Sequence, residues 1–140
     1  MAFVSVTRLR VRGFRFLPTI ALHTWRSRRQ LRGAEGFIGG YLATGPRLTL
    51  WTVTVWANEA AMRAYRNAAP HLKAMPKLIR ACDEAAVVHW TSGDGAVPSP
   101  AEAAERMKAG RLSKVRHPSA DHLAGEAWAD GEVPARGPGL

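Results

Sequence analysis

Residues 48–56 constrain the fold most, because apolar and mixed positions alternate along them at every step. One face carries Trp51, Val53 and Val55, and the opposite face carries Leu50, Thr52, Thr54 and Trp56. Strict alternation of this kind predicts a β-strand with two different faces. Helical patterns follow directly, and a further strand is predicted to end at Trp90. The stretch therefore predicts a strand, two helical segments and a strand.

Two helices are predicted between these strands. Asn58 can cap the first helix, whose apolar side carries Met62 and Tyr65. The second begins after Pro70, and its apolar stripe recurs at helical spacing at His71, Met75, Leu78 and Cys82. A proline inside this second stripe is expected to kink or restart the helix. His71 is thus placed at the start of a helix, on its apolar side.

Three more elements are predicted within the first ninety residues. Residues 3–11 alternate and form the first strand, and Pro18 suits the first turn of a helix that would run to about Leu31. Residues 37–44 form a strand that a Gly-Pro turn joins to the strand at 48–56, so these two are expected to pair as an antiparallel hairpin. The resulting order is strand, helix, strand, strand, helix, strand. This order predicts an α+β, ferredoxin-like fold with a four-stranded antiparallel sheet and helices on one face.

A sheet covered on one face only would leave its other face bare. Bulky apolar side chains fall on both faces of the predicted strands, so either face would expose them. Pairing with a second copy is the usual way to cover such a face. A homodimer is therefore predicted.

Three parts are expected along the chain: a ferredoxin-like domain at 1–93, a C-terminal helix within 94–112, and a tail at 113–140. A Ser-Pro-Ala-Glu capping box at 99–102 predicts the start of the helix. The tail is rich in Gly, Pro, Ala and charged residues, so we expect it to be flexible or to dock through Leu123 and Trp128. The tail histidines His117 and His122 are expected to be solvated.

The composition argues against several classes of protein. No apolar run approaches the roughly 18 residues that a membrane-spanning helix needs. The N-terminus lacks the features of a secretory signal, and the single cysteine, Cys82, is predicted to be a buried structural thiol. A cytoplasmic location is the default expectation. No zinc-site spacing and no nucleotide or flavin motif is present, so neither a metal nor such a cofactor is expected.

The positive charge is concentrated near the N-terminus. Residues 1–32 contain eight arginines and no acidic residue, whereas the rest of the chain has twelve basic and eleven acidic residues. Such an excess could bind a polyanion, or could belong to a targeting peptide. However, Arg8, Arg10 and Arg12 alternate with apolar residues as on a half-exposed strand. A solvated basic face is therefore favoured over polyanion binding.

With this element order in place, the segment from Trp56 to Tyr65 (Trp-Ala-Asn-Glu-Ala-Ala-Met-Arg-Ala-Tyr) resembles the dimeric α+β barrel superfamily, which contains the antibiotic biosynthesis monooxygenases. The segment from Tyr65 to Trp90, with Pro70-His71-Leu72 and Met75, is similar to the spheroidene monooxygenase branch. The resemblance covers about residues 3–92. It implies a pocket between the sheet and the helices, used for cofactor-free oxygenation in some members and for haem chemistry in others.

Two histidines are the candidate catalytic residues. The helix dipole at the start of a helix favours a neutral His71, which could accept a proton or, as the resemblance implies, ligate haem iron. His89 could orient a substrate from its strand, although a sheet histidine is more often structural. The candidate substrate-binding residues are Trp51, Tyr65, His23 and Met75. Core packing explains the aromatic residues equally well, so both readings stay open.

The sequence thus supports a monooxygenase-like enzyme acting on a small apolar or aromatic molecule. A non-catalytic dimer that binds haem or another hydrophobic ligand is the alternative, since the superfamily contains both kinds of protein. Polyanion binding by the arginine-rich region is the third hypothesis, weakened by the scarcity of aromatic residues between those arginines.

Overall fold

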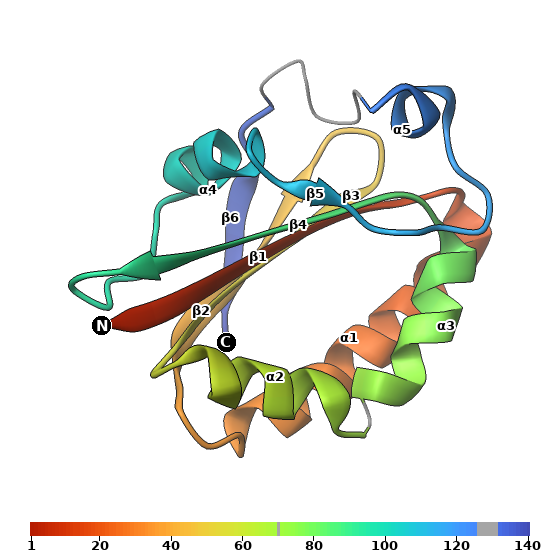
Figure 1. Cartoon of the computed structure of the whole chain (residues 1–140). Helices are drawn as coiled ribbons and strands as arrows, with labels where there is room; N and C mark the ends of the chain where they lie inside the picture. Colours follow the sequence, from red (N-terminus) through yellow and green to blue (C-terminus); the bar gives the residue numbers. More distant parts are fainter. Residues whose placement is uncertain (70, 126–131) are drawn as a thin grey trace.

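A computed structural model describes residues 1–69, 71–125 and 132–140. Its centre is one antiparallel sheet with the strand order β5-β4-β1-β3-β2-β6 (Figure 1). The strands are β1 (Ala2–Val11), β2 (Phe37–Gly45), β3 (Thr49–Trp56), β4 (Cys82–Ser92), β5 (Arg111–Leu112) and β6 (Ala135–Gly139). The four inner strands are the predicted ones, and β2 and β3 pair as the predicted hairpin. The prediction of a four-stranded sheet was wrong, because β5 and β6 extend it at both edges.

Three helices cover one face of the sheet (Figure 1). They are α1 (Leu17–Arg32), α2 (Glu59–Asn67) and α3 (His71–Ala81), and a short 3-10 helix (Phe14–Phe16) precedes α1. Asn58 caps α2 as predicted, since its side chain accepts a hydrogen bond from the Ala61 N–H at 2.8 Å. Pro76 lies inside α3, which continues past it to Ala81. Cys82 then begins β4 and is fully buried, as expected for a structural thiol.

The opposite face of the sheet, here called the far face, is covered by the chain itself. The helix α4 (Pro100–Met107), capped by Ser99 as predicted, packs Ala103 and Met107 against this face, and both side chains are fully buried. The residues beneath them form the main apolar core, which includes Val4, Val6, Trp51, Val53 and Val55. The far face is therefore not bare, and the need for a second copy on it disappears.

The far face also holds a buried ion-pair network. Arg8, expected on a half-exposed strand, is 0% exposed. It donates hydrogen bonds to Glu84 at 2.9 Å and to Glu132 at 2.7 Å. Arg10 pairs with Asp83 at 2.7 Å, while Glu84 also accepts a hydrogen bond from the Ser119 hydroxyl at 2.8 Å. The basic stripe of β1 is thus partly neutralised inside the molecule, which removes much of the expected basic surface.

The C-terminal residues that the structure describes add a short helix, α5 (Ala120–Ala124), besides β5 and β6. His122 is buried with 9% of its surface exposed, so the expectation that it is solvated was wrong. Leu123 is 74% exposed and does not dock on the body. Trp128 lies outside the described residues. No helix among the described residues is long and apolar enough to cross a membrane.

Candidate functional site

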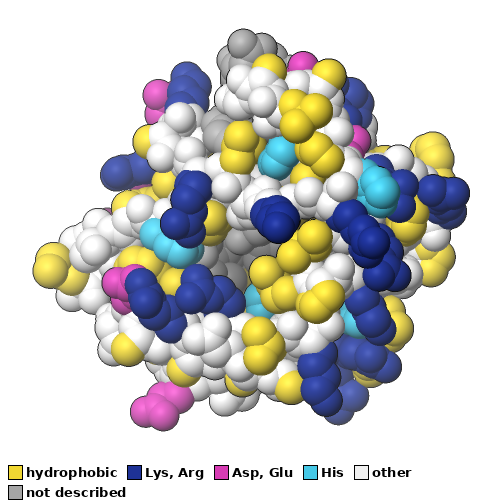
Figure 2. All heavy atoms as spheres, turned by 45° about the vertical axis from the view of Figure 1, so that its right-hand side comes forward, with side chains coloured by type: hydrophobic (Ala, Val, Ile, Leu, Met, Phe, Trp, Pro, Cys, Tyr) yellow, Lys and Arg dark blue, Asp and Glu magenta, His cyan; other side chains and the backbone are white. Residues whose placement is uncertain are grey.

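The two faces of the sheet differ in how tightly they are packed. Along the middle of the far face, Val6 and its partner Val53 are 0% exposed. On the helix side the neighbouring row of residues, Val87, Thr7 and Thr52, is only half-buried, although three helices lie over it. Solvent therefore reaches the middle of the sheet between the two layers. Figure 2 looks toward this side and shows its surface hollowed at the centre, with hydrophobic, basic and histidine side chains around the opening.

This space is here called the helix-side hollow. Its sheet side is the row just described, and His89 lies on the same face of β4. Tyr65 of α2 and His71 of α3 belong to the helix layer over this face (Figure 1). His71 is the first residue of α3, and its ring lies 5.0 Å from the ring of Tyr65, centroid to centroid. The side chain of Gln30 on α1 links the backbone of His71 to that of Tyr65. Its oxygen accepts the His71 N–H at 2.8 Å, and its amide donates to the Tyr65 carbonyl at 3.0 Å.

One ring nitrogen of His71 has a defined role. Nδ1 lies 3.2 Å from the backbone carbonyl oxygen of Arg66. A carbonyl oxygen can only accept a hydrogen bond, so Nδ1 carries the proton and Nε2 keeps a lone pair. Burial is the main cause that lowers the pKa of His71. The hydrogen bond to the Arg66 carbonyl opposes this shift, and the positive charge of Arg66 adds to it. The neutral ring can therefore accept a proton, or bind a metal, through Nε2.

Aromatic side chains connect the two layers at this end of the sheet. Trp56 lies 5.3 Å from Tyr65 and pairs in the sheet with Phe3, whose ring lies 5.2 Å from His89. The Tyr65 hydroxyl donates to the Ser27 carbonyl at 3.3 Å, and burial raises the pKa of Tyr65 to about 12. Tyr65 is therefore a neutral phenol near neutral pH and cannot act as the base.

His89 lies on the helix-facing side of β4, in register with Ser5 of β1. Partial burial lowers its pKa, and the positive charges of Arg66 and Arg111 lower it further. His89 and His71 thus reach the same hollow from the sheet and from the helix layer, respectively, and both favour the neutral form.

The remaining predicted residues are placed differently. His23 on α1 is buried with 5% exposed, and its pKa is lowered by burial and by the charges of Lys77 and Arg26. Met75 lies one turn along α3 from His71 and is half-buried. Trp51 points to the far face, where it is 1% exposed and packs in the main core. The structure therefore separates Trp51 from the other five candidates by the thickness of the sheet.

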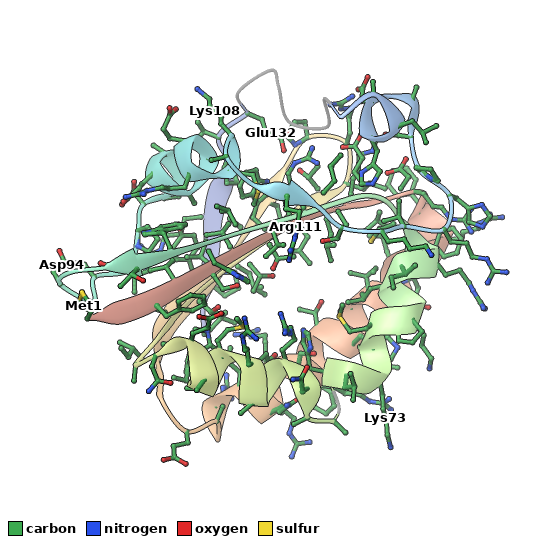
Figure 3. All side chains as sticks on the ribbon, in the orientation of Figure 1. Met1, Lys73, Asp94, Lys108, Arg111 and Glu132 are labelled. Atoms are coloured by element: carbon green, nitrogen blue, oxygen red, sulfur yellow. The ribbon has the colours of Figure 1, made fainter. Side chains whose placement is uncertain are left out.

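Sequence reasoning missed three residues around the hollow: Gln30, Arg66 and Arg111. Arg111 pairs with Val87 across the sheet, so it lies on the face of β4 that carries His89. Figure 3 labels Arg111 below β5, toward the space between sheet and helices. No sequence signal marks it, because a two-residue strand has no alternation to detect. Gln30 lies 41 residues from His71 in the chain, which leaves no local pattern either.

A second hollow, of about 430 Å³, lies on the far-face side of the sheet, between the end of β4 and α4. Its lining includes Trp90, Asp94, Glu102 and Arg106, and the Arg106 guanidinium covers the Trp90 ring at 5.0 Å. It contains none of the six candidate site residues. Across the described part of the chain, no three His, Cys, Asp or Glu side chains are grouped so as to hold a metal ion.

Comparisons with known proteins identify the fold. No protein-family model and no curated protein sequence matches this chain. Solved structures do match. SnoaB from Streptomyces nogalater, a cofactor-independent oxygenase, is 18% identical with a TM-score of 0.55, over 65% of this chain and 92% of SnoaB. A conserved protein from Methanosarcina mazei is 14% identical with a TM-score of 0.60, over 66% of this chain and 93% of its own.

A proposed antibiotic biosynthesis monooxygenase from Nitrosomonas europaea is 10% identical, again with a TM-score of 0.60, over 66% of this chain and 91% of its own. At these identities the likeness shows the fold and not the activity. The predicted α+β fold is confirmed: the chain has the fold of these solved structures, among them a cofactor-independent oxygenase and a protein described as an antibiotic biosynthesis monooxygenase.

Proposed function

We propose that the protein is a monooxygenase-like enzyme that acts on a small, electron-rich aromatic or apolar molecule in the helix-side hollow. The observation that carries this proposal is the state of His71, a neutral imidazole with Nδ1–H donated to the Arg66 carbonyl and Nε2 able to accept a proton. A base of this kind is what cofactor-free oxygenation needs. The oxygenase named among the structural matches supports this reading by its fold.

The proposed chemistry starts with proton transfer. Nε2 of His71 accepts a proton from an acidic C–H or O–H of the substrate, which leaves an electron-rich anion. The anion adds dioxygen at carbon, and loss of water leaves one oxygen atom in the product as a carbonyl group and the other in the water. Tyr65 and Phe3 would hold a planar ring by stacking, and His89 would orient it from the sheet.

Oxygen uptake tests this proposal. Purified protein is offered anthrone-type substrates in an oxygen electrode, together with a His71→Ala variant and a His117→Gln variant as control. His117 is exposed and lies in the C-terminal part, away from the hollow. We expect His71→Ala to lose turnover by about 10²–10⁴-fold, the usual contribution of a general base. Full activity of His71→Ala would contradict the assignment.

A non-catalytic protein that binds haem or another hydrophobic ligand is the second candidate. A histidine that ligates iron usually donates its other ring nitrogen to a carbonyl or carboxylate, and His71 does so. The residues present therefore fit haem, which would supply redox chemistry through its iron while His71 fixed its position. The visible spectrum with added haem tests this: a Soret band that shifts or vanishes in His71→Ala would support it, and a spectrum identical in both proteins would contradict it.

Three further properties belong with these proposals. A homodimer remains a prediction, although a second copy would have to use a surface other than the covered far face. Binding of a polyanion would have to use arginines other than Arg8 and Arg10, which are already paired inside the protein. A cytoplasmic location is likewise a proposal.

A further inference from the structure

The helix-side hollow carries two positive charges that the proposed chemistry leaves unused. Arg111 lies at the sheet edge on the helix side, and Arg66 lies in the last turn of α2, where both charges are close enough to act on His89. The backbone carbonyl of Arg66 accepts the hydrogen bond from His71, so this residue lies next to the proposed base. Because Arg111 pairs with Val87, two residues from His89 on the same face of β4, the second charge lies next to the other histidine.

Neither arginine is neutralised by a carboxylate within the part of the chain that the structure describes. Arg63, one turn earlier on α2, offers a contrast, because it pairs with Glu59 at 2.6 Å. On the far face, Arg8 and Arg10 of β1 are likewise fully or partly buried in ion pairs. Two unpaired guanidinium groups from two different layers therefore border the same hollow.

We infer that the ligand of this hollow carries an acidic group, such as a carboxylate, in addition to its planar apolar part, and that Arg66 and Arg111 bind this group. The inference rests on the proposed function, since it assumes that the hollow is the binding site. Guanidinium groups bind carboxylates and related anions through paired hydrogen bonds, and such contacts strengthen away from bulk water. The aromatic residues at the same hollow suit the planar part. The electrostatics agree, because both charges also lower the pKa of His89.

Two fluorescent probes of nearly the same shape test this inference. 8-Anilinonaphthalene-1-sulfonate carries an anionic group, and N-phenyl-1-naphthylamine has the same aromatic parts without it. Each probe is titrated into the full-length protein, and competition between them shows whether they share a site. We expect the anionic probe to bind at least about tenfold more tightly, because hydrogen bonds to charged groups are stronger than those between neutral groups. Its affinity should fall as salt is added.

The variants Arg111→Gln and Arg66→Gln should each lose most of the preference for the anionic probe and leave binding of the neutral probe unchanged. Lys73→Gln is the matched control. Lys73 is exposed on α3, and Figure 3 shows it pointing away from the sheet. This variant removes the same charge from the same helix layer and should bind both probes as the wild type does. Circular dichroism checks that each variant is folded.

The outcomes separate the two proposals. Equal affinity for both probes in the wild type, or an anion preference that survives in both arginine variants, would overturn the inference and leave the proposed function standing. Failure of the neutral probe to bind at all would contradict the hollow as an apolar site, and with it the proposed function.

The acidic group could belong to a substrate or to the propionates of haem, which share the same carboxylate chemistry. Haem and its dimethyl ester distinguish these sources. A preference for free haem over the ester that is lost in Arg111→Gln would assign the arginines to haem. Equal binding of haem and ester, combined with an arginine-dependent preference for the anionic probe, would assign them to a substrate.

Discussion

At the scale of single residues, His71 shows how backbone contacts can set the chemistry of a side chain. The carbonyl of Arg66 fixes the tautomer, and the side chain of Gln30 holds the backbone N–H at the start of α3. Neither contact involves another titratable side chain. The proton-accepting nitrogen is thus defined by packing between α1, α2 and α3.

The histidines make stability depend on pH. Burial lowers the pKa of His23, His71 and His89 in the folded protein below the usual value. Below about pH 6.5 the unfolded chain therefore binds more protons than the folded protein does. The folded protein loses stability as the pH falls from about 6.5 to the lower pKa values of the folded state. Urea unfolding at about pH 7.5 and about pH 5.5 should show lower stability at the lower pH.

His71→Gln, which cannot titrate, should show a smaller loss between the two pH values than the wild type does. An equal loss in both proteins would mean that His71 does not contribute to the pH dependence.

Gln30 is expected to act as a positioning residue. In Gln30→Leu, the His71 N–H loses its partner, while the carbonyls of Tyr65 and Ala68 each lose one donor and keep a backbone N–H donor. We expect the free energy of unfolding to fall by about 1–3 kcal/mol, the cost of leaving such an N–H group unpaired. The ¹⁵N spectrum of the His71 ring should shift as well, which a purely structural residue elsewhere would not cause. Gln30→Glu keeps the acceptor for His71 and should lie between wild type and Gln30→Leu.

At the scale of elements, strands β1 and β4 are held together by side-chain ion pairs as well as by the backbone hydrogen bonds of the sheet. Glu84 is fully buried and accepts hydrogen bonds from Arg8 at 2.9 Å and Ser119 at 2.8 Å. Its removal would leave Arg8 with fewer partners in a dry environment. We expect Glu84→Gln to destabilise the protein by about 3–5 kcal/mol in urea unfolding, as breaking a buried ion pair usually does.

Glu59→Gln is the control for this prediction, since its ion pair with Arg63 is exposed. A change within about 1 kcal/mol is expected there. Similar losses of unfolding free energy in the two variants would show that the buried network stabilises the protein no more than an exposed ion pair does.

Alternation in the sequence was enough to predict the four inner strands and the two faces of β3. It placed Trp51 and Trp56 on opposite faces correctly, but it could not say which face the helices cover. Trp51 was therefore grouped with Tyr65 although it faces α4. Arg8 followed the same alternation and looked half-exposed, because Glu84 and Glu132, which pair with it, lie 76 and 124 residues away.

At the scale of the whole molecule, the C-terminal part completes the fold. The helix α4 covers the far face, and β5 and β6 add both edge strands. The sequence did not predict these strands, because β5 is two residues long and β6 consists of Ala-Arg-Gly-Pro-Gly. Short or Gly- and Pro-rich strands have no hydrophobic period to detect. The homodimer was predicted from a bare face that α4 in fact covers.

This cover can be tested by placing a charge under α4. Met107 is fully buried against the far face, so Met107→Lys should loosen α4 and expose apolar side chains. We expect concentration-dependent self-association in analytical ultracentrifugation beyond that of the wild type. Glu105→Lys, an exposed position on the same helix, should behave as the wild type does. Unchanged behaviour of Met107→Lys would mean that α4 does not shield the sheet.

The most direct test of the account is a ¹⁵N NMR titration of the His71 ring in the full-length protein, with His71→Gln used to assign its signals. The account predicts a neutral ring with the proton on Nδ1, a bare Nε2, and a pKa below the usual histidine value. A proton on Nε2 in the neutral ring, or a pKa at or above the usual value of about 6.5, would contradict it.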